Sequence, residues 1–355
     1  MIMLHGKSTF CGLSNRCLFF SALLVFSLSI NANSVDERKH YVQQDYKRAI
    51  HALIQGDERL ANEIIGSEIK HQTKDFAEFE IIFRLEQGDI DTVIEKLEQY
   101  ETVYGELAET FSFTAIVWRS VGHEVNIFSK WGYYNRALKA KVRAGQLAPE
   151  APYFLTLQAS AIGQDEALAR EGETQLTLTN KIMSLNKKWG LISQINYAQN
   201  TNDQTTGIKL SKKAAAEFEK DFEIQERLGQ YYWTIGLTEK AQHHFWEACK
   251  SPPDYSWRSD VAWSNACYQV AQFALQKSIN IDLGVEALNI LLGHYTLPTR
   301  SNFNLVVMLF KLTANKLPIQ AVKILNRIVK ESDDKKLVKE ARVVLQTIDN
   351  ISVKN

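Results

Sequence analysis

Residues 222–253 read FEIQERLGQYYWTIGLTEKAQHHFWEACKSPP, and this stretch decides the fold. Its apolar spacing predicts two amphipathic helices that meet at Gly236, a residue suited to the left-handed backbone that ends a helix. Gly229 in the first helix and Ala241 in the second are small enough to let the helices pack closely. A glycine inside a helix costs about 1 kcal/mol relative to alanine, so it usually has a packing reason. We expect Thr238 to cap the second helix.

The same stretch matches a known repeat spacing. The tetratricopeptide (TPR) signature is W-x2-L-G-x2-Y, then A-x3-F, then a closing proline. Gln225 stands where the tryptophan of the signature would be, and the matching residues are Leu228, Gly229, Tyr232, Ala241, Phe245, Ala248 and Pro253. The stretch therefore resembles a TPR, and the chain is similar to exported bacterial TPR proteins. This resemblance implies a scaffold for binding rather than a site of chemistry.

Weaker copies of the unit recur along the chain. Gly56 and Gly88 follow apolar helical patterns 32 residues apart, and Gly122 comes 34 residues after Gly88. Asp57 and Asp89 directly follow the first two glycines, where an aspartate caps the next helix. Three glycine-centred turns at this spacing predict a solenoid of stacked helix pairs.

The predicted fold class is all-α, because the chain has six prolines and few strand-like alternations. We expect an α-α superhelix of about seven or eight helical hairpins over residues 35–350, with residues 222–253 as its best repeat. A charged final helix, residues 335–348, is expected to cover the otherwise exposed end of the core.

The N-terminal segment has the layout of a secretory signal peptide. Basic residues precede an apolar run of 13 residues (18–30), and small and polar residues follow it. The run is short for a membrane span, which needs about 20 residues. We expect residues 1–32 to be a signal peptide, with cleavage after Ala32 or Ser34, which places the protein in the periplasm or outside the cell with no transmembrane segment. The alternative is an uncleaved anchor in the inner membrane.

Two cysteines remain after the predicted cleavage, Cys249 and Cys267. In a regular repeat, the first lies near the end of one helix and the second about ten residues into the next. That register separates them by roughly 12 Å along the helix axis, and a disulfide needs Cα atoms within about 7 Å. We therefore expect two buried free thiols.

Partner-binding residues are expected on the first helix of each pair. In TPR arrays these helices line a concave groove, and helical spacing directs one face of the best repeat and of the next helix toward it. The predicted groove residues are Glu223, Glu226, Gln230, Trp233, Trp257, Asp260 and Ser264. They suit a protein or peptide partner, and the two tryptophans also suit a glycan or small molecule. Both tryptophans have an alternative role, packing between neighbouring helices.

The sequence contains few motifs for catalysis, metal binding or nucleic-acid binding. A formal net charge of zero argues against nucleic acid as a partner. No phosphate loop, dinucleotide motif or zinc-protease helix occurs, and scattered acids such as Asp57 and Asp260 have no placed partner. Adjacent residues His243 and His244 point about 100° apart on a helix, so we expect them on a solvated face rather than on a metal. We expect a non-enzymatic protein with no catalytic residue, metal or cofactor.

Overall fold

A computed structural model describes residues 60, 63–64, 73–251, 257–293, 303–313, 318–332 and 334–352. Within these ranges the chain forms fifteen α-helices and one 3-10 helix, and no strand. The predicted signal peptide and the predicted turn at Gly56 and Asp57 lie outside the described residues.

The helices pair in chain order into seven hairpins followed by one last helix. Their bounds are α4 (Lys74–Gln87), α5 (Ile90–Tyr104), α6 (Ala108–Glu124), α7 (Ile127–Leu147), α8 (Pro152–Ile162), η1 (Glu166–Leu168), α9 (Gln175–Leu185), α10 (Lys187–Asn200), α11 (Gln204–Glu217), α12 (Phe222–Thr234), α13 (Thr238–Lys250), α14 (Trp257–Lys277), α15 (Ile281–Gly293), α16 (Phe303–Thr313), α17 (Ile319–Glu331) and α18 (Lys335–Ser352).

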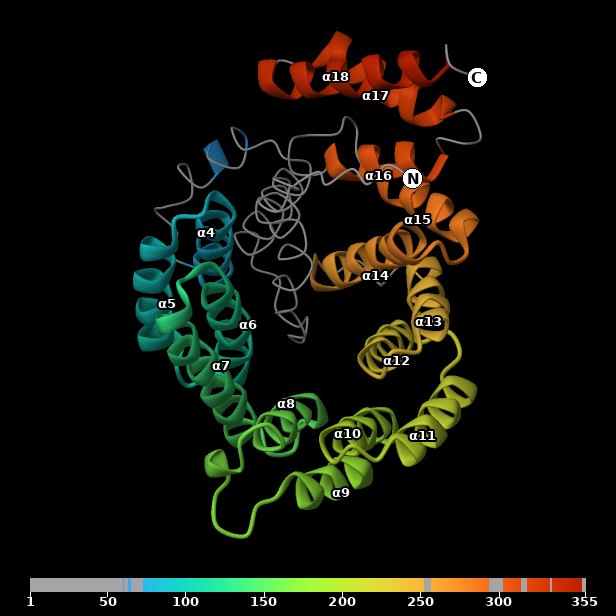
Figure 1. Ribbon diagram of the computed structural model, residues 1–355. Helices are drawn as coiled ribbons and strands as arrows, with labels where there is room; N and C mark the ends of the chain where they lie inside the picture. Colours follow the sequence, from blue (N-terminus) through green and yellow to red (C-terminus); the bar gives the residue numbers. More distant parts are fainter. Residues whose placement is uncertain are drawn as a thin grey trace, which may run out of the picture.

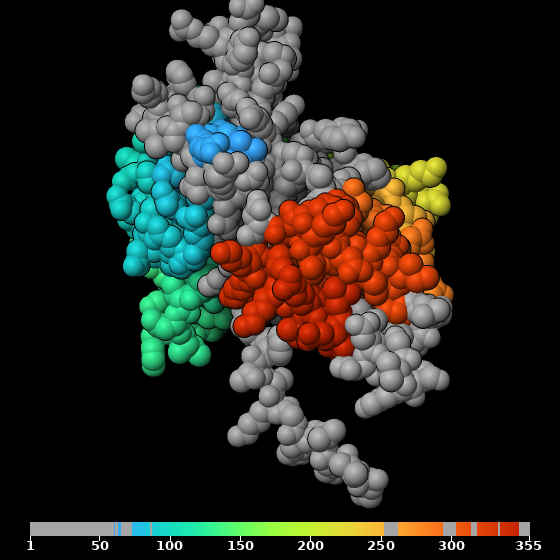
Figure 2. Space-filling view, turned by 90° about the horizontal axis from the view of Figure 1, so that it is seen from above, coloured from blue at the N-terminus to red at the C-terminus, as the bar shows by residue number. Residues whose placement is uncertain are grey.

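The hairpins stack into an open arc (Figure 1). Helices α4, α6, α8, α10, α12 and α14 lie on the inside of the arc, and α5, α7, α9, α11, α13 and α15 lie outside them. Seen from above, α17 and α18 and the first hairpin, α4 and α5, are both in view, so both ends of the described arc are on this side (Figure 2). The prediction of an all-α superhelix is confirmed.

Two of the predicted glycine turns have the expected geometry. Gly88 ends α4 with φ 75°, and the Asp89 side chain then caps α5 by accepting from the Thr92 N–H at 3.4 Å. Gly236 has φ 77° between α12 and α13. Glycine adopts this left-handed backbone at no steric cost, because it has no Cβ, and that explains its presence at both turns. The predicted cap at Thr238 is wrong, because Thr238 is already the first residue of α13.

The third predicted turn is wrong. Gly122 lies inside α6, and the turn comes later, where the Asn126 side chain accepts from the N–H groups of Phe128 and Ser129 and so begins α7. A Cβ on Gly122 would lie 3.1 Å from the Tyr134 ring of α7. This glycine therefore serves the crossing of two helices rather than the turn between them.

The α12–α13 hairpin packs as its sequence predicts. A Cβ on Gly229 would lie 2.7 Å from the Phe245 ring, so the missing side chain is what lets α13 approach. Leu228 and Ala241 are fully buried beside this contact. The crossing through small residues is confirmed.

Gln225 replaces the missing tryptophan with a buried polar network. Its side-chain nitrogen donates to the Glu219 carbonyl at 2.8 Å, so its side-chain oxygen is left to accept from His244 Nδ1 at 2.7 Å. The His244 ring stacks on Tyr232, with centroids 5.2 Å apart. His243 is exposed, but His244 is half-buried, so the expectation of two solvated histidines is wrong for His244.

The expectation of two free thiols is also wrong. Cys249 and Cys267 form a disulfide, with Cα atoms 4.8 Å apart. The Trp263 indole N–H donates to the Cys249 carbonyl at 2.6 Å. The end of α13 thus packs against the middle of α14 and not against its first turn, which removes the axial offset assumed for a regular repeat.

No helix among the described residues is both long enough and apolar enough to span a bilayer.

Candidate partner-binding face

The inner helix α12 presents one open face. Its buried residues are Ile224, Gln225, Leu228, Gly229, Tyr231 and Tyr232. The remaining side chains recur three or four residues apart, so they share the opposite face. They include the four predicted α12 residues Glu223, Glu226, Gln230 and Trp233, and also Arg227, which the sequence reasoning missed although the same periodicity marks it.

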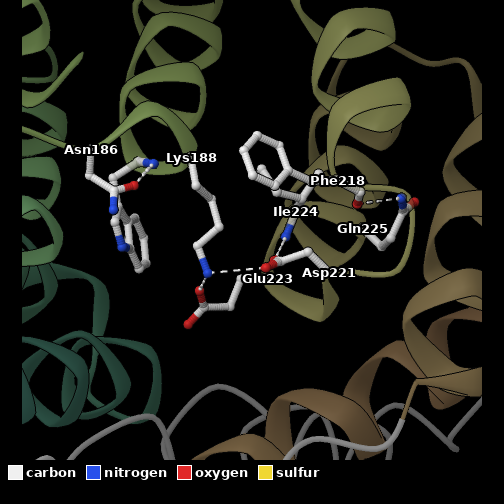
Figure 3. A network of polar contacts seen from close by, with 8 residues as sticks. Asn186, Lys188, Phe218, Asp221, Glu223, Ile224 and Gln225 are labelled. Atoms are coloured by element: carbon white, nitrogen blue, oxygen red, sulfur yellow. Dashed lines mark hydrogen bonds and ion pairs between the residues drawn. The ribbon is translucent and has the colours of Figure 1, made fainter. Parts of the chain in front are cut away.

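An ion-pair cluster joins α10 to the start of α12 (Figure 3). The Lys188 ammonium lies 3.2 Å from Asp221 Oδ2 and also pairs with Glu223. Asp221 has a second role, because its Oδ1 accepts from the Ile224 N–H and caps α12. Burial alone would lower the pKa of Lys188, but the hydrogen bonds and charges of Glu223 and Asp221 outweigh it and raise the pKa. Lys188 therefore stays charged and fixes these carboxylates in place.

A second polar cluster follows one turn later on α12. Arg227 Nη1 donates to Gln230 Oε1 at 2.7 Å, and the Gln230 amide donates to Glu226. Burial raises the pKa of Glu226 and lowers that of Arg227, while each charge partly offsets the shift of the other. These half-buried groups hold one another in place before any partner arrives.

Two further cations, Arg119 on α6 and Lys141 on α7, interact electrostatically with Arg227. Burial of Lys141 on α7, together with the charges of Arg119 on α6 and of Arg227, lowers the pKa of Lys141 to about 8.

Aromatic rings lie between the charged groups. Tyr153 on α8 and Trp189 on α10 meet edge to face, with centroids 5.0 Å apart, and the Lys188 ammonium lies 5.5 Å from the Trp189 ring centre. Sequence reasoning did not select them, because the contact joins residues of two hairpins. Both rings are half-buried, so part of each remains open.

The Trp233 ring is shared between helix packing and the open face of α12. Trp233 is 49% exposed, and its ring packs edge-on against Phe273 of α14. Half of the ring thus serves helix packing, as the alternative held, and half faces outward. Ser264 is half-buried on α14. Trp257 and Asp260 are in the α14 helix, but their side chains lie outside the described residues.

Among the described residues, no three His, Cys, Asp or Glu side chains gather closely enough to hold a metal ion. The carboxylates of Glu223 and Asp221 share the Lys188 ammonium. This arrangement can bind charged and amide groups by hydrogen bonds and ion pairs.

Comparison with known protein families and with curated proteins finds no match. Similar solved structures include a tetratricopeptide repeat protein from Parabacteroides merdae, at 11% identity and a TM-score of 0.37, covering 76% of this chain and 99% of that protein. The APC/C hetero-tetramer Cut9–Hcn1 aligns at 15% identity and a TM-score of 0.33, covering 82% of this chain and 53% of that one. The apo form of the quorum sensor NprR from B. thuringiensis aligns at 12% identity and a TM-score of 0.27. The alignment covers 88% of this chain and 99% of that one.

The chain's own geometry settles its class. Seven stacked hairpins form an arc, and its best repeat crosses through Gly229 against Phe245, at the positions of the TPR signature. The described residues form an all-α solenoid whose best repeat has the spacing of the TPR signature.

Proposed function

We propose that this protein is an exported, non-enzymatic scaffold that binds a segment of a protein partner on the inner face of its arc, across α8, α10 and α12. The observation that carries the proposal is the row of pre-organised polar groups on α12, with Lys188 beside it. Alternating charges and amides along a helix suit the charged side chains and amides of a peptide, and Trp189 and Trp233 offer anchors of the kind that dominate protein interfaces.

The proposed location is the periplasm or the cell exterior. The layout of residues 1–32 supports it, and so does the Cys249–Cys267 disulfide, because such bonds persist in oxidising compartments and are rare in the cytosol. Detection of the protein in a periplasmic fraction, with its N terminus determined by mass spectrometry, would test this part.

The partner is tested by affinity purification from the native cell envelope. Arg227→Ala should reduce the amount of partner protein retained at least tenfold, because the substitution frees Gln230 and Glu226 from their fixed arrangement. Glu239→Ala is the matched control, since Glu239 is exposed on the outer helix α13. A partner retained equally by both variants would contradict binding at this face.

A glycan or small-molecule ligand is the second candidate, favoured by the outward half of Trp233. Titration with an oligosaccharide panel should then change the intrinsic tryptophan fluorescence. Trp233→Ala should abolish that change while leaving the far-UV circular dichroism unaltered.

A further inference from the structure

The start of α7 exposes three large apolar side chains within five residues. Ile127 is 71% exposed, Phe128 93% and Trp131 76%. Single apolar side chains on a surface are ordinary, but a contiguous group marks a contact site. We call these three residues the α7 tip.

The α7 tip is held rigidly by its neighbours. Asn126 accepts from the Phe128 and Ser129 N–H groups at 3.0 and 3.2 Å, which fixes the first turn. The Trp131 ring packs edge-on against Tyr134, and the Tyr134 hydroxyl is 2.9 Å from His123 Nδ1. The exposed side chains therefore project from a structured helix end.

Helix α7 itself carries cations and no acid, and the exposed Glu124 lies just before its start. Between Glu124 and Glu150 the sequence has no acid and has five cations, which are Lys130, Arg136, Lys139, Lys141 and Arg143. Arg136 is neutralised by Glu98 of α5 at 2.7 Å. Lys139 is exposed and lies three turns after Phe128 on the same side of α7. The exposed side of α7 thus carries apolar groups at its start and the exposed cation Lys139 farther along.

We propose that the α7 tip inserts into the surface of an anionic lipid bilayer. Ile127, Phe128 and Trp131 would lie at the boundary between headgroups and acyl chains, and Lys130 and Lys139 beside the lipid phosphates. Tryptophan and phenylalanine next to lysine is the composition that favours this boundary.

A bilayer fits the α7 tip better than a protein partner does. A protein partner would need a pocket for each projecting side chain. Lipid accommodates side chains that are 71–93% exposed without any pocket. The predicted export signal would also bring the chain to a membrane. This inference does not depend on the inner face, since the α7 tip is on a different helix.

Vesicle co-sedimentation tests the proposal with the purified protein. Vesicles of phosphatidylcholine are compared with vesicles that contain about one quarter phosphatidylglycerol. The protein should bind the anionic vesicles, and the double variant Ile127→Ser/Phe128→Ser should bind at least tenfold less. Val103→Ser is the matched control, because Val103 is 69% exposed on α5 and is not part of the α7 tip.

A second measurement separates the α7 tip from any attachment through residues 18–30. Brominated lipid should quench the fluorescence of Trp131, so Trp131→Phe should still bind vesicles but lose the quenched fraction. Absence of vesicle binding, binding that the double variant leaves unchanged, or quenching unaltered in Trp131→Phe would each overturn the proposal. Loss of self-association in the double variant, without vesicle binding, would instead identify a second copy of the chain as the occupant.

Discussion

At the scale of single residues, glycines in similar positions have opposite structural roles. Gly229 is inside α12 with the Phe245 ring where its Cβ would be, whereas Gly132 is inside α7 with nothing within 4 Å. An added methyl group at Gly229 forces the ring aside, at about 1–3 kcal/mol. At Gly132 it only improves helix propensity, by up to about 1 kcal/mol.

Gly229→Ala should therefore destabilise the protein by up to about 2 kcal/mol after its own propensity gain. Gly132→Ala should leave stability unchanged or raise it slightly. Urea denaturation followed by circular dichroism measures both midpoints. Equal midpoints for the two variants would show that the close approach of α13 to α12 does not depend on Gly229.

His244 makes stability depend on pH. Burial, with smaller effects of His243 and Lys240, lowers the pKa of His244 from 6.5 to about 4. The unfolded state therefore binds more protons than the folded state in this interval. The contribution of neutral His244 to the free energy of unfolding is fully present above pH 6.5, and it falls by at most about 3 kcal/mol as the pH drops toward 4.

His244→Asn should flatten this acid dependence, because asparagine can still donate to Gln225 but does not titrate. Thermal unfolding midpoints between pH 7 and pH 4 provide the measurement. His243→Asn, which changes an exposed neighbour, should keep most of the slope. A slope that persists in His244→Asn would assign the acid sensitivity to other groups.

At the scale of elements, the disulfide holds the end of α13 against the middle of α14. It closes a loop of 18 residues, and constraining the unfolded chain by such a loop is worth about 3 kcal/mol. The oxidised protein should therefore lose about that much stability on treatment with reductant. Cys249→Ser/Cys267→Ser should start from the lower value and be insensitive to reductant. An identical response of both proteins to reductant would contradict a disulfide at this position.

At the scale of elements, some features could be predicted from the sequence and others could not. Gly88 and Gly236 were predictable because a left-handed turn needs glycine, and the open face of α12 was predictable because a helix repeats every 3.6 residues. The Cys249–Cys267 bond was not predictable, because it depends on the axial position of α14 relative to α13. The Lys188–Glu223 pair spans 35 residues and two hairpins, so no local pattern marks it. Whether the predicted groove residues bind a partner stays a prediction.

At the scale of the whole molecule, the hydrophobic core is divided. One cluster of buried side chains runs from Leu191 on α10 to Ala341 on α18, and another from Ile64 to Ala137 on α7. A smaller cluster between them is built on α7, α8 and α9. In a solenoid each repeat contacts only its neighbours, so stability is a sum of local contributions rather than a property of one core.

Unfolding should therefore follow the clusters and not occur in one step. Gly229→Ala weakens only the cluster that contains Phe245, so it should speed amide hydrogen exchange in α10–α18 while α4–α7 stay protected. Hydrogen exchange read by mass spectrometry, peptide by peptide, distinguishes these regions within one sample. A single cooperative core would instead transmit the loss of stability to every helix. Equally faster hydrogen exchange in α4–α7 would therefore show that the arc folds as one unit. Its inner face could then not loosen locally to admit a partner.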